Sequence, residues 1–169
     1  YDVPDSSIYA PAVTWAAEEG ITTGCTDVRF CPSRPVTRAQ FAAFLWRLAG
    51  QPPGAGPQFA DVSPDAYYAT AVRWVRDEGI TSGCTATTFC PNAPATRAQL
   101  VTFLWRRAGE PDARGGHGFE DVPAGAYYEE AVVWARDEGI TTGTSSRQFS
   151  PNDPVTRGQT VLFLERYAR

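Results

Sequence analysis

Residues 37–48 read TRAQFAAFLWRL, and the same pattern returns as TRAQLVTFLWRR at 96–107 and TRGQTVLFLERY at 156–167. Thr followed three residues later by Gln is a capping box, in which each side chain satisfies a free backbone N–H of the other residue at a helix start. In the first copy, apolar residues follow at the i, i+3, i+4 and i+7 spacing of a core-facing helix: Phe41, Phe44, Leu45 and Leu48. Each copy therefore predicts a helix that begins after the Thr and turns one face to a core.

A second segment is repeated ahead of each of these helices. It contains Ile-Thr-Thr/Ser-Gly at residues 21–24, 80–83 and 140–143, at offsets of 59 and 60 residues. Aligned without gaps, residues 59–108 and 119–168 are identical at 28 of 50 positions. Such self-similarity indicates a duplicated structural unit. We predict three repeats, at residues 1–50, 51–109 and 110–169, joined by Gly- and Pro-rich linkers at 50–57 and 109–118 and forming one cooperative unit.

A first helix is predicted in each repeat before the Ile-Thr segment. In the second repeat, Ser63 and Pro64 predict its start, because Ser is a good N-cap and Pro suits the first helical position. Gly79 predicts its end as a left-handed cap, with Ile80 folding back on the last turn. One helix pair buries too little surface to be stable alone. We therefore expect an all-α fold of three helix-loop-helix repeats, with pseudo-threefold symmetry and the three second helices packed together in a central bundle.

Composition excludes several classes of function. Of 169 residues, 43% are hydrophobic and 20% charged, as in folded globular chains. The net charge of −4 argues against nucleic acid, and no apolar run approaches the roughly 18 residues of a membrane span. The single His117 lies in a linker, so it supports no Ser-His-Asp or Cys-His arrangement. The acidic pairs Glu18-Glu19, Asp77-Glu78 and Asp137-Glu138 could suggest a glycosidase, but adjacent residues near a helix end point in different directions, so a solvated helix end is the better interpretation. We predict no enzyme activity and no cofactor.

The four cysteines form two pairs with equal spacing, Cys25 with Cys31 and Cys84 with Cys90. We interpret each pair as a local disulfide. Such bonds form in an oxidising, extracytoplasmic compartment. A zinc site with four cysteines is the alternative. The third repeat argues against zinc, because Thr144 and Ser150 occupy the same places. No metal site is therefore predicted.

The order of these motifs resembles the S-layer homology family over nearly the whole chain. The family pattern is Phe-x-Asp-Val, a helix with Trp, Gly-Ile-x-x-Gly, Phe-x-Pro and Thr-Arg-Ala-Glu. The second repeat matches it with FADV at 59–62, Trp74, GITSG at 79–83, FCP at 89–91 and TRAQ at 96–99. Three features depart from it: Gln replaces Glu in every copy, Gly158 replaces Ala in the third, and the first repeat lacks the opening Phe. From the last, we expect this chain to be part of a larger secreted protein.

The resemblance implies a three-pronged module with grooves between its prongs. It also implies a place on the bacterial cell surface and a partner, a secondary cell-wall polysaccharide that often carries a pyruvylated sugar. One Arg, one Trp, one Asp and one Gly of each repeat are implied to bind it: Arg38, Arg97 and Arg157; Trp15, Trp74 and Trp134; Asp2, Asp61 and Asp121; Gly24, Gly83 and Gly143.

Each of these residue types also has a purely structural interpretation. The Trp side chains fit an apolar helix face, the Asp side chains suit the turn before the first helix, and the Gly residues suit a backbone conformation barred to other residues. For the Arg residues, the structural interpretation is a solvated side chain in the first helical turn, which the helix dipole slightly disfavours. The functional one is that the helix N-terminus supplies free N–H groups and partial positive charge, so a guanidinium there favours an acidic sugar. The alternative function is a protein-binding or self-assembly module, with Trp46 and Trp105 as interface anchors. Otherwise these two Trp residues are expected to pack between prongs.

Overall fold

The computed structural model describes residues 2–169 and contains six helices in this part of the chain. They are α1 (Ala10–Glu18), α2 (Arg38–Leu48), α3 (Ala69–Asp77), α4 (Arg97–Arg107), α5 (Glu129–Asp137) and α6 (Arg157–Ala168). Within residues 2–169 the only β-type pairings are isolated bridges. The predicted all-α class is therefore confirmed. None of the helices in this range has the length and hydropathy needed to cross a membrane.

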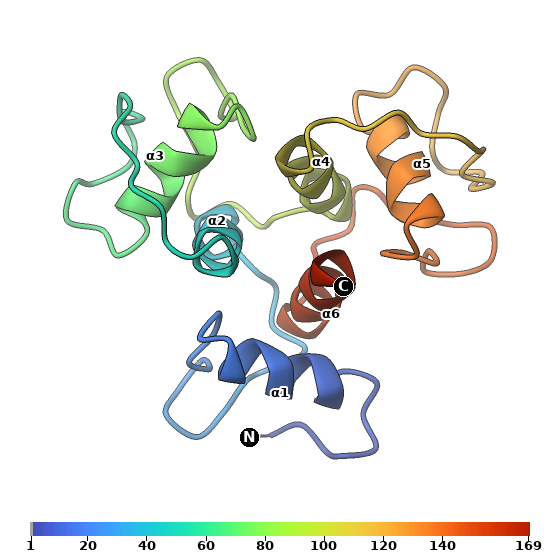
Figure 1. Ribbon diagram of the computed structural model, residues 1–169, viewed down its shortest axis with the longest axis horizontal. Coiled ribbons are helices and arrows are strands. Elements are labelled where there is room, and N and C mark those ends of the chain that lie inside the picture. The colour runs from blue at the N-terminus through green and yellow to red at the C-terminus, as the bar shows by residue number, and fades with distance from the viewer. Residues whose placement is uncertain (1) are drawn as a thin grey trace.

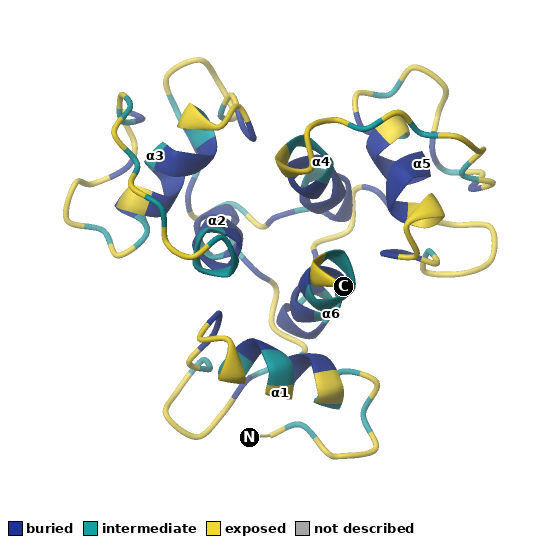
Figure 2. Cartoon of the chain, viewed as in Figure 1, coloured by how far each residue is buried: buried dark blue, intermediate teal, exposed yellow. Residues whose placement is uncertain are grey.

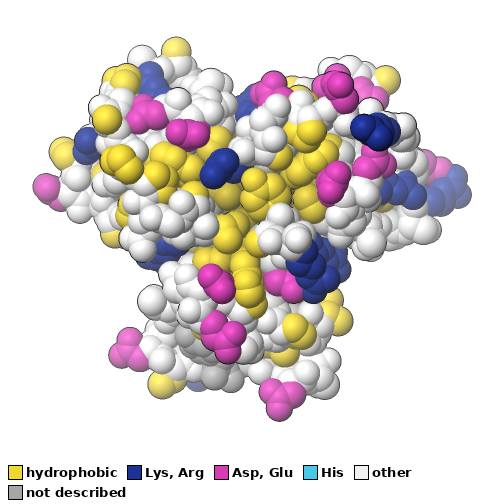
Figure 3. Space-filling view, viewed as in Figure 1, with side chains coloured by type: hydrophobic (Ala, Val, Ile, Leu, Met, Phe, Trp, Pro, Cys, Tyr) yellow, Lys and Arg dark blue, Asp and Glu magenta, His cyan; other side chains and the backbone are white. Residues whose placement is uncertain are grey.

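The second helices of the three repeats, α2, α4 and α6, stand together at the centre (Figure 1). The first helices, α1, α3 and α5, lie outside them, one in each of three prongs. Burial follows this arrangement, since the central helices and the inner faces of the outer ones are buried (Figure 2). On the face that carries the C-terminus, hydrophobic side chains gather around the axis, and charged side chains lie mostly toward the rim (Figure 3).

The packing unit is not the sequence repeat. Helix α2 packs against α3, α4 against α5 and α6 against α1, so each prong joins the second helix of one repeat to the first helix of the next. The α1–α6 contact closes this chain of pairings into a ring. Because each repeat supplies half of two prongs, no repeat holds a complete helix pair of its own.

A triangle of backbone hydrogen bonds connects the repeats at the start of the central bundle. The N–H of Val36 donates to Val155, that of Val155 to Ala95, and that of Ala95 to Val36, at N···O distances of 2.8–2.9 Å. All three residues are almost completely buried. These bonds fix the three loops against one another immediately before α2, α4 and α6. The pseudo-threefold symmetry expected from the repeats is thus present in the backbone itself.

Of the three kinds of helix end predicted from the sequence, two are confirmed and one is wrong. All three capping boxes are present, with the Thr hydroxyl accepting from the Gln N–H and the Gln amide oxygen accepting in return. Gly79 has a φ of 70° and Ile80 is fully buried, as predicted. The predicted start of the first helix at Ser63 is wrong, because α3 begins at Ala69. Residues 63–69 instead form successive turns whose hydrogen bonds span three residues rather than four.

The two linkers lie against the helices rather than free in solvent. The indole N–H of Trp46 donates to the carbonyl of Pro52 at 2.7 Å, and that of Trp105 to Pro111 at 2.9 Å. At the other end of the first linker, the Asp77 carboxylate accepts from the backbone N–H groups of residues 55 and 56. Trp46 and Trp105 therefore hold the linkers, a role that the expectation of packing between prongs did not include.

Candidate functional site

Three equivalent grooves lie between the prongs, and each is built from all three repeats. Groove 1 is lined by residues 22–25, Gln40, Arg47, Tyr67 and Arg157 among others, with a volume of about 280 Å³. Groove 2 is lined by residues 81–84, Gln99, Arg106, Tyr127 and Arg38 among others, with about 430 Å³. Groove 3 is lined by residues 141–143, Gln159, Arg166, Ile8 and Arg97 among others, with about 160 Å³.

An arginine from the first turn of a central helix lies at the base of each groove. Arg38, Arg97 and Arg157 are only 3–5% exposed. The Nε of Arg38 donates to the backbone carbonyl of Phe89 at 2.8 Å, and its guanidinium lies 4.8 Å from the centre of the Phe89 ring. Arg97 has the same two contacts with Phe149. Each guanidinium is thus fixed on the aromatic residue of a neighbouring repeat.

In two of these arginines, one terminal nitrogen of the guanidinium makes no hydrogen bond within the described residues. The Nη2 atoms of Arg38 and Arg97 are buried and have no hydrogen-bond partner among the described residues, whereas Nη2 of Arg157 donates to the hydroxyl of Thr22 at 3.1 Å. Burial lowers the pKa of Arg38 and of Arg97, because it removes water from the charged form. Since arginine stays protonated in proteins, each groove holds a buried positive charge.

The helix N-termini do not supply free N–H groups to these grooves, and this part of the expectation is wrong. The N–H groups of Arg38 and Ala39 donate to the carbonyls of Ala93 and Pro91, and the corresponding groups of α4 and α6 bind the preceding loops of the other repeats in the same way. The third N–H is bonded to the capping Thr. Any attraction of an anion to a groove therefore rests on arginine side chains rather than on the helix backbone.

A second arginine, which was not among the residues predicted from the sequence to bind the ligand, lines each groove. Arg47, Arg106 and Arg166 lie on the last turns of α2, α4 and α6. Each uses Nη1 to bind the carbonyl of the buried Ile of its own repeat, at 3.0–3.1 Å. The sequence does contain a signal for them, since an arginine occurs at this position in all three repeats. Each groove thus combines a basal and a last-turn guanidinium group from different repeats, and Arg34 is a third arginine in the lining of groove 1.

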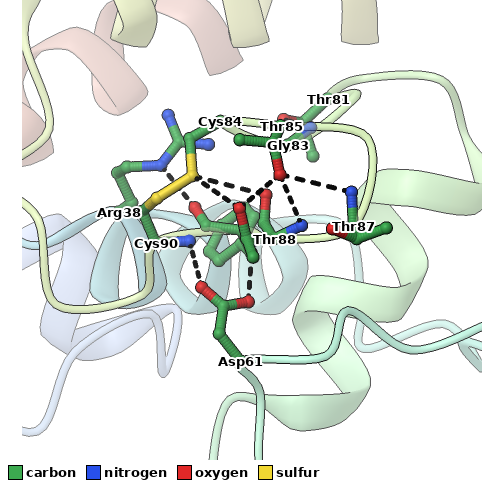
Figure 4. Close-up of a disulfide and its surroundings, with 10 residues drawn as sticks. Arg38, Asp61, Thr81, Gly83, Cys84, Thr85, Thr87, Thr88 and Cys90 are labelled. Atoms are coloured by element: carbon green, nitrogen blue, oxygen red, sulfur yellow. Dashed lines mark hydrogen bonds between the residues drawn. A yellow bond between two sulfur atoms is a disulfide. The ribbon is translucent and has the colours of Figure 1, made fainter.

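The predicted Asp residues hold the loop that carries the groove. The carboxylate of Asp61 accepts from the N–H of Phe89 at 2.8 Å and of Cys90 at 2.7 Å, so Phe89 connects it to Arg38 (Figure 4). Asp121 binds the corresponding backbone in the third repeat. Asp2 does so in the first, where the N–H of Cys31 lowers its pKa. These contacts favour a structural role, but they fix the loop before the second helix rather than the turn before the first.

The predicted Gly residues line the grooves in a backbone conformation that residues with a side chain rarely adopt. Gly24, Gly83 and Gly143 have φ angles of 86–93°. A Cβ atom on Gly83 would lie 2.5 Å from the carbonyl oxygens of Thr85 and Thr88, and one on Gly143 would meet the same crowding. Real Cβ atoms do not approach so closely, so the Gly residues bring the main chain to the edge of the groove for conformational reasons.

The predicted Trp residues lie outside the three grooves. Trp74 and Trp134 are 3% and 5% exposed and belong to the hydrophobic core, while Trp15 is partly buried against it. None of them is among the side chains that line groove 1, 2 or 3. Their burial favours core packing, the structural interpretation given above, over stacking on a sugar.

The cysteine pairs form the two predicted disulfides, Cys25–Cys31 and Cys84–Cys90. In the third repeat, the hydroxyls of Thr144 and Ser150 are 2.7 Å apart and hydrogen-bonded, so they bridge the same loop without a covalent bond. Across residues 2–169, no group of three or more His, Cys, Asp or Glu side chains is arranged to hold a metal ion. Cys25 and Cys84 line grooves 1 and 2, respectively.

We predict that replacing Cys84 and Cys90 together with the third repeat's residues, Cys84→Thr and Cys90→Ser, will keep the fold but lower its stability. A loop of about seven residues loses roughly 2–2.5 kcal/mol of chain-entropy stabilisation when its disulfide is removed. The new hydroxyl pair should recover about 1 kcal/mol as a hydrogen bond. Urea unfolding would measure the net loss, with the Cys84→Ala, Cys90→Ala variant as control. Equal stability of the two variants would contradict the hydrogen-bond substitution.

Comparison with known proteins identifies the repeats. The S-layer homology domain profile matches residues 1–42, 58–101 and 118–161. A surface-layer 125 kDa protein of Lysinibacillus sphaericus is 32% identical over 75% of this chain, and a cell surface protein of Thermoanaerobacter kivui is 28% identical over 98%. An endoglucanase of a Bacillus species is 32% identical over 64% of this chain.

The chain spans only 11–20% of the length of these three relatives. The segment shared with surface-layer proteins and with an enzyme is therefore the repeat region, and the enzyme's resemblance does not indicate catalysis here. The three profile matches contain the groove-lining Ile-Thr segments and the basal arginines of all three repeats. This chain belongs to the S-layer homology domain family.

Proposed function

We propose that this chain is a non-catalytic module that attaches a larger secreted protein to the bacterial cell wall by binding an acidic secondary wall polysaccharide in its grooves. The observation that carries the proposal is the pair of guanidinium groups in each groove, contributed by two different repeats. Two of the basal guanidinium groups also keep a buried nitrogen unpaired within the described residues. A buried donor without an acceptor is costly, so a ligand or an ordered water that accepts its hydrogen bond would be stabilised there.

The composition of the grooves supports an acidic sugar as the ligand. None of the side chains lining groove 1, 2 or 3 is acidic. Beside the arginines stand neutral hydrogen-bonding groups suited to sugar hydroxyls, such as Gln99, Thr81 and Ser82 in groove 2. A guanidinium binds a carboxylate through two parallel hydrogen bonds, and a pyruvyl substituent would supply such a carboxylate.

A protein-binding role has less support from the side chains proposed for it. Trp46 and Trp105 are partly buried, and their indole N–H groups are already bonded to linker carbonyls. An interface anchor normally offers a large side chain that a partner can enclose. Both Trp residues are instead occupied in fixing the chain between neighbouring prongs.

The proposal is tested by sedimentation with bacterial cell walls. Walls that retain their secondary polymer should carry the protein into the pellet, because the acidic sugars remain available to the arginines. Walls stripped of this polymer with hydrofluoric acid should not, and added soluble polymer should release bound protein. Equal binding to intact and stripped walls would contradict the proposal and favour recognition of peptidoglycan or a wall protein.

A further inference from the structure

The three grooves differ at several lining positions, and one of these lies on their open side beside the arginines. Tyr67 lines groove 1 and Tyr127 lines groove 2, whereas the same repeat position in groove 3 is Ile8. All three side chains are well exposed, at 64%, 63% and 73%, respectively. The difference therefore lies on the open side of each groove, where a bound sugar would be contacted.

The two tyrosines are held in place and lie near the basal and the last-turn arginine of their grooves. The ring of Tyr67 packs edge-on against Tyr68 at 5.0 Å, and Tyr127 packs against Tyr128 at the same distance. Partial burial raises the pKa of Tyr67, and the charges of Arg47 and Arg157 oppose this change. Arg38 and Arg106 oppose the corresponding change in Tyr127. Each phenol thus stands within the electrostatic reach of its two guanidinium groups.

Groove 3 also has less space. Its volume of about 160 Å³ is below those of grooves 1 and 2. Tyr9 lines it, while the counterparts Tyr68 and Tyr128 are absent from the linings of grooves 1 and 2. A Cβ atom on Gly158 would lie 2.8 Å from the Tyr9 ring, so the ring occupies space that an Ala side chain would take. The replacement of Ala by Gly in the third repeat therefore has a packing reason.

From these differences we propose that Tyr67 and Tyr127 are specificity-determining residues that hydrogen-bond the wall sugar in grooves 1 and 2, and that groove 3 is a weak site. This inference rests on the proposed function. A phenol beside two guanidinium groups adds a donor and acceptor that can select a sugar hydroxyl next to the acidic group. Ile8 offers neither, and the phenol that does line groove 3, Tyr9, stands at the next position of the repeat, so groove 3 lacks a hydrogen-bonding group at the point where Tyr67 and Tyr127 stand.

Isothermal titration calorimetry tests the proposal with wall-polymer fragments released by muramidase and sized to a single polymer chain. Wild-type protein should show two tight sites. The double variant Tyr67→Phe, Tyr127→Phe removes only the two hydroxyls, and it should bind about fivefold more weakly at each site. Tyr167→Phe, which removes the same group outside the grooves, is the matched control and should bind like wild type. Ile8→Tyr should strengthen the third site.

The outcomes separate the two proposals. Failure of the wild-type protein to bind the fragments would overturn the cell-wall function and this inference with it. Three equal wild-type sites, or wild-type affinity in the double Phe variant, would overturn only the assignment of Tyr67 and Tyr127. Thermal unfolding of each variant shows whether the fold is retained. A loss of binding by a folded double Phe variant supports the inference.

Discussion

Replacing Gly83 with Ala will destabilise the protein by about 2–5 kcal/mol, because two costs combine at this position. A φ of 92° costs an L-residue roughly 1–2 kcal/mol. The new methyl group would also lie 2.5 Å from two backbone carbonyl oxygens and 2.7 Å from the Phe59 ring, and such overpacking costs about 1–3 kcal/mol. Because the carbonyls belong to the groove loop itself, the loop has no side chain that could move aside.

A matched control lies four residues earlier in the chain. Gly79 also has a positive φ, 70°, but no atom lies within 4 Å of the position that a Cβ would take. Gly79→Ala should therefore lose only the conformational part, about 1 kcal/mol. The free energy of unfolding in urea, measured for both variants, isolates the packing term. Equal losses would show that the groove loop relaxes around the methyl group and that Gly83 is needed only for its backbone conformation.

Local sequence rules predicted the parts of this fold that depend on neighbouring residues. The capping boxes at Thr37, Thr96 and Thr156 and the left-handed cap at Gly79 follow from contacts within one turn, and the structure confirms them. The disulfides likewise close short loops. The start of α3 was missed because Tyr68 precedes it without a side-chain cap, so no residue signals the boundary.

The arrangement between repeats could not be predicted from these rules. The pairing of α6 with α1 joins the two ends of the chain, and equivalent repeats give no pattern that distinguishes it from pairing within a repeat. For the same reason, the hydrogen-bond acceptors of the first N–H groups of the central helices could not be predicted. The N–H of Arg38, for example, donates to the carbonyl of Ala93, 55 residues away. One signal for the grooves was present in the sequence: an arginine recurs at the same position of each repeat, as Arg47, Arg106 and Arg166. This recurrence could have identified these three residues as part of the site.

These contacts between repeats make the groove a property of the whole ring. Groove 2 takes its loop and Gln99 from the second repeat, Arg38 from the first and Tyr127 from the third. A single repeat therefore contains neither a complete groove nor a complete prong. The proposed binding and the fold depend on the same residues, so a binding experiment is informative only when the variant keeps the positive charge at the base of the groove and remains folded.

Replacing Arg38, Arg97 and Arg157 together with Lys meets this requirement and should reduce wall binding strongly. Lys keeps the positive charge over the Phe rings but lacks the planar fork that binds a carboxylate through two hydrogen bonds. Losing one charge-assisted hydrogen bond costs about 1.5–3 kcal/mol, or roughly 10- to 150-fold in affinity per groove. Each substitution also removes the Nε bond to a Phe carbonyl, which should lower stability by about 1 kcal/mol per site.

The control is a triple Lys variant at Arg29, Arg114 and Arg147, which are exposed and line none of the three grooves. It makes the same chemical change three times and leaves the net charge unaltered, so it measures any general preference of the wall for arginine. Wall sedimentation isotherms, recorded below the melting temperature of each variant, should show normal binding for this control and little for the groove variant. If both variants bound like wild type, simple positive charge would suffice for attachment. The carboxylate geometry inferred from the buried guanidinium groups would then be wrong, since a fork that contributes nothing cannot be what recognises the sugar.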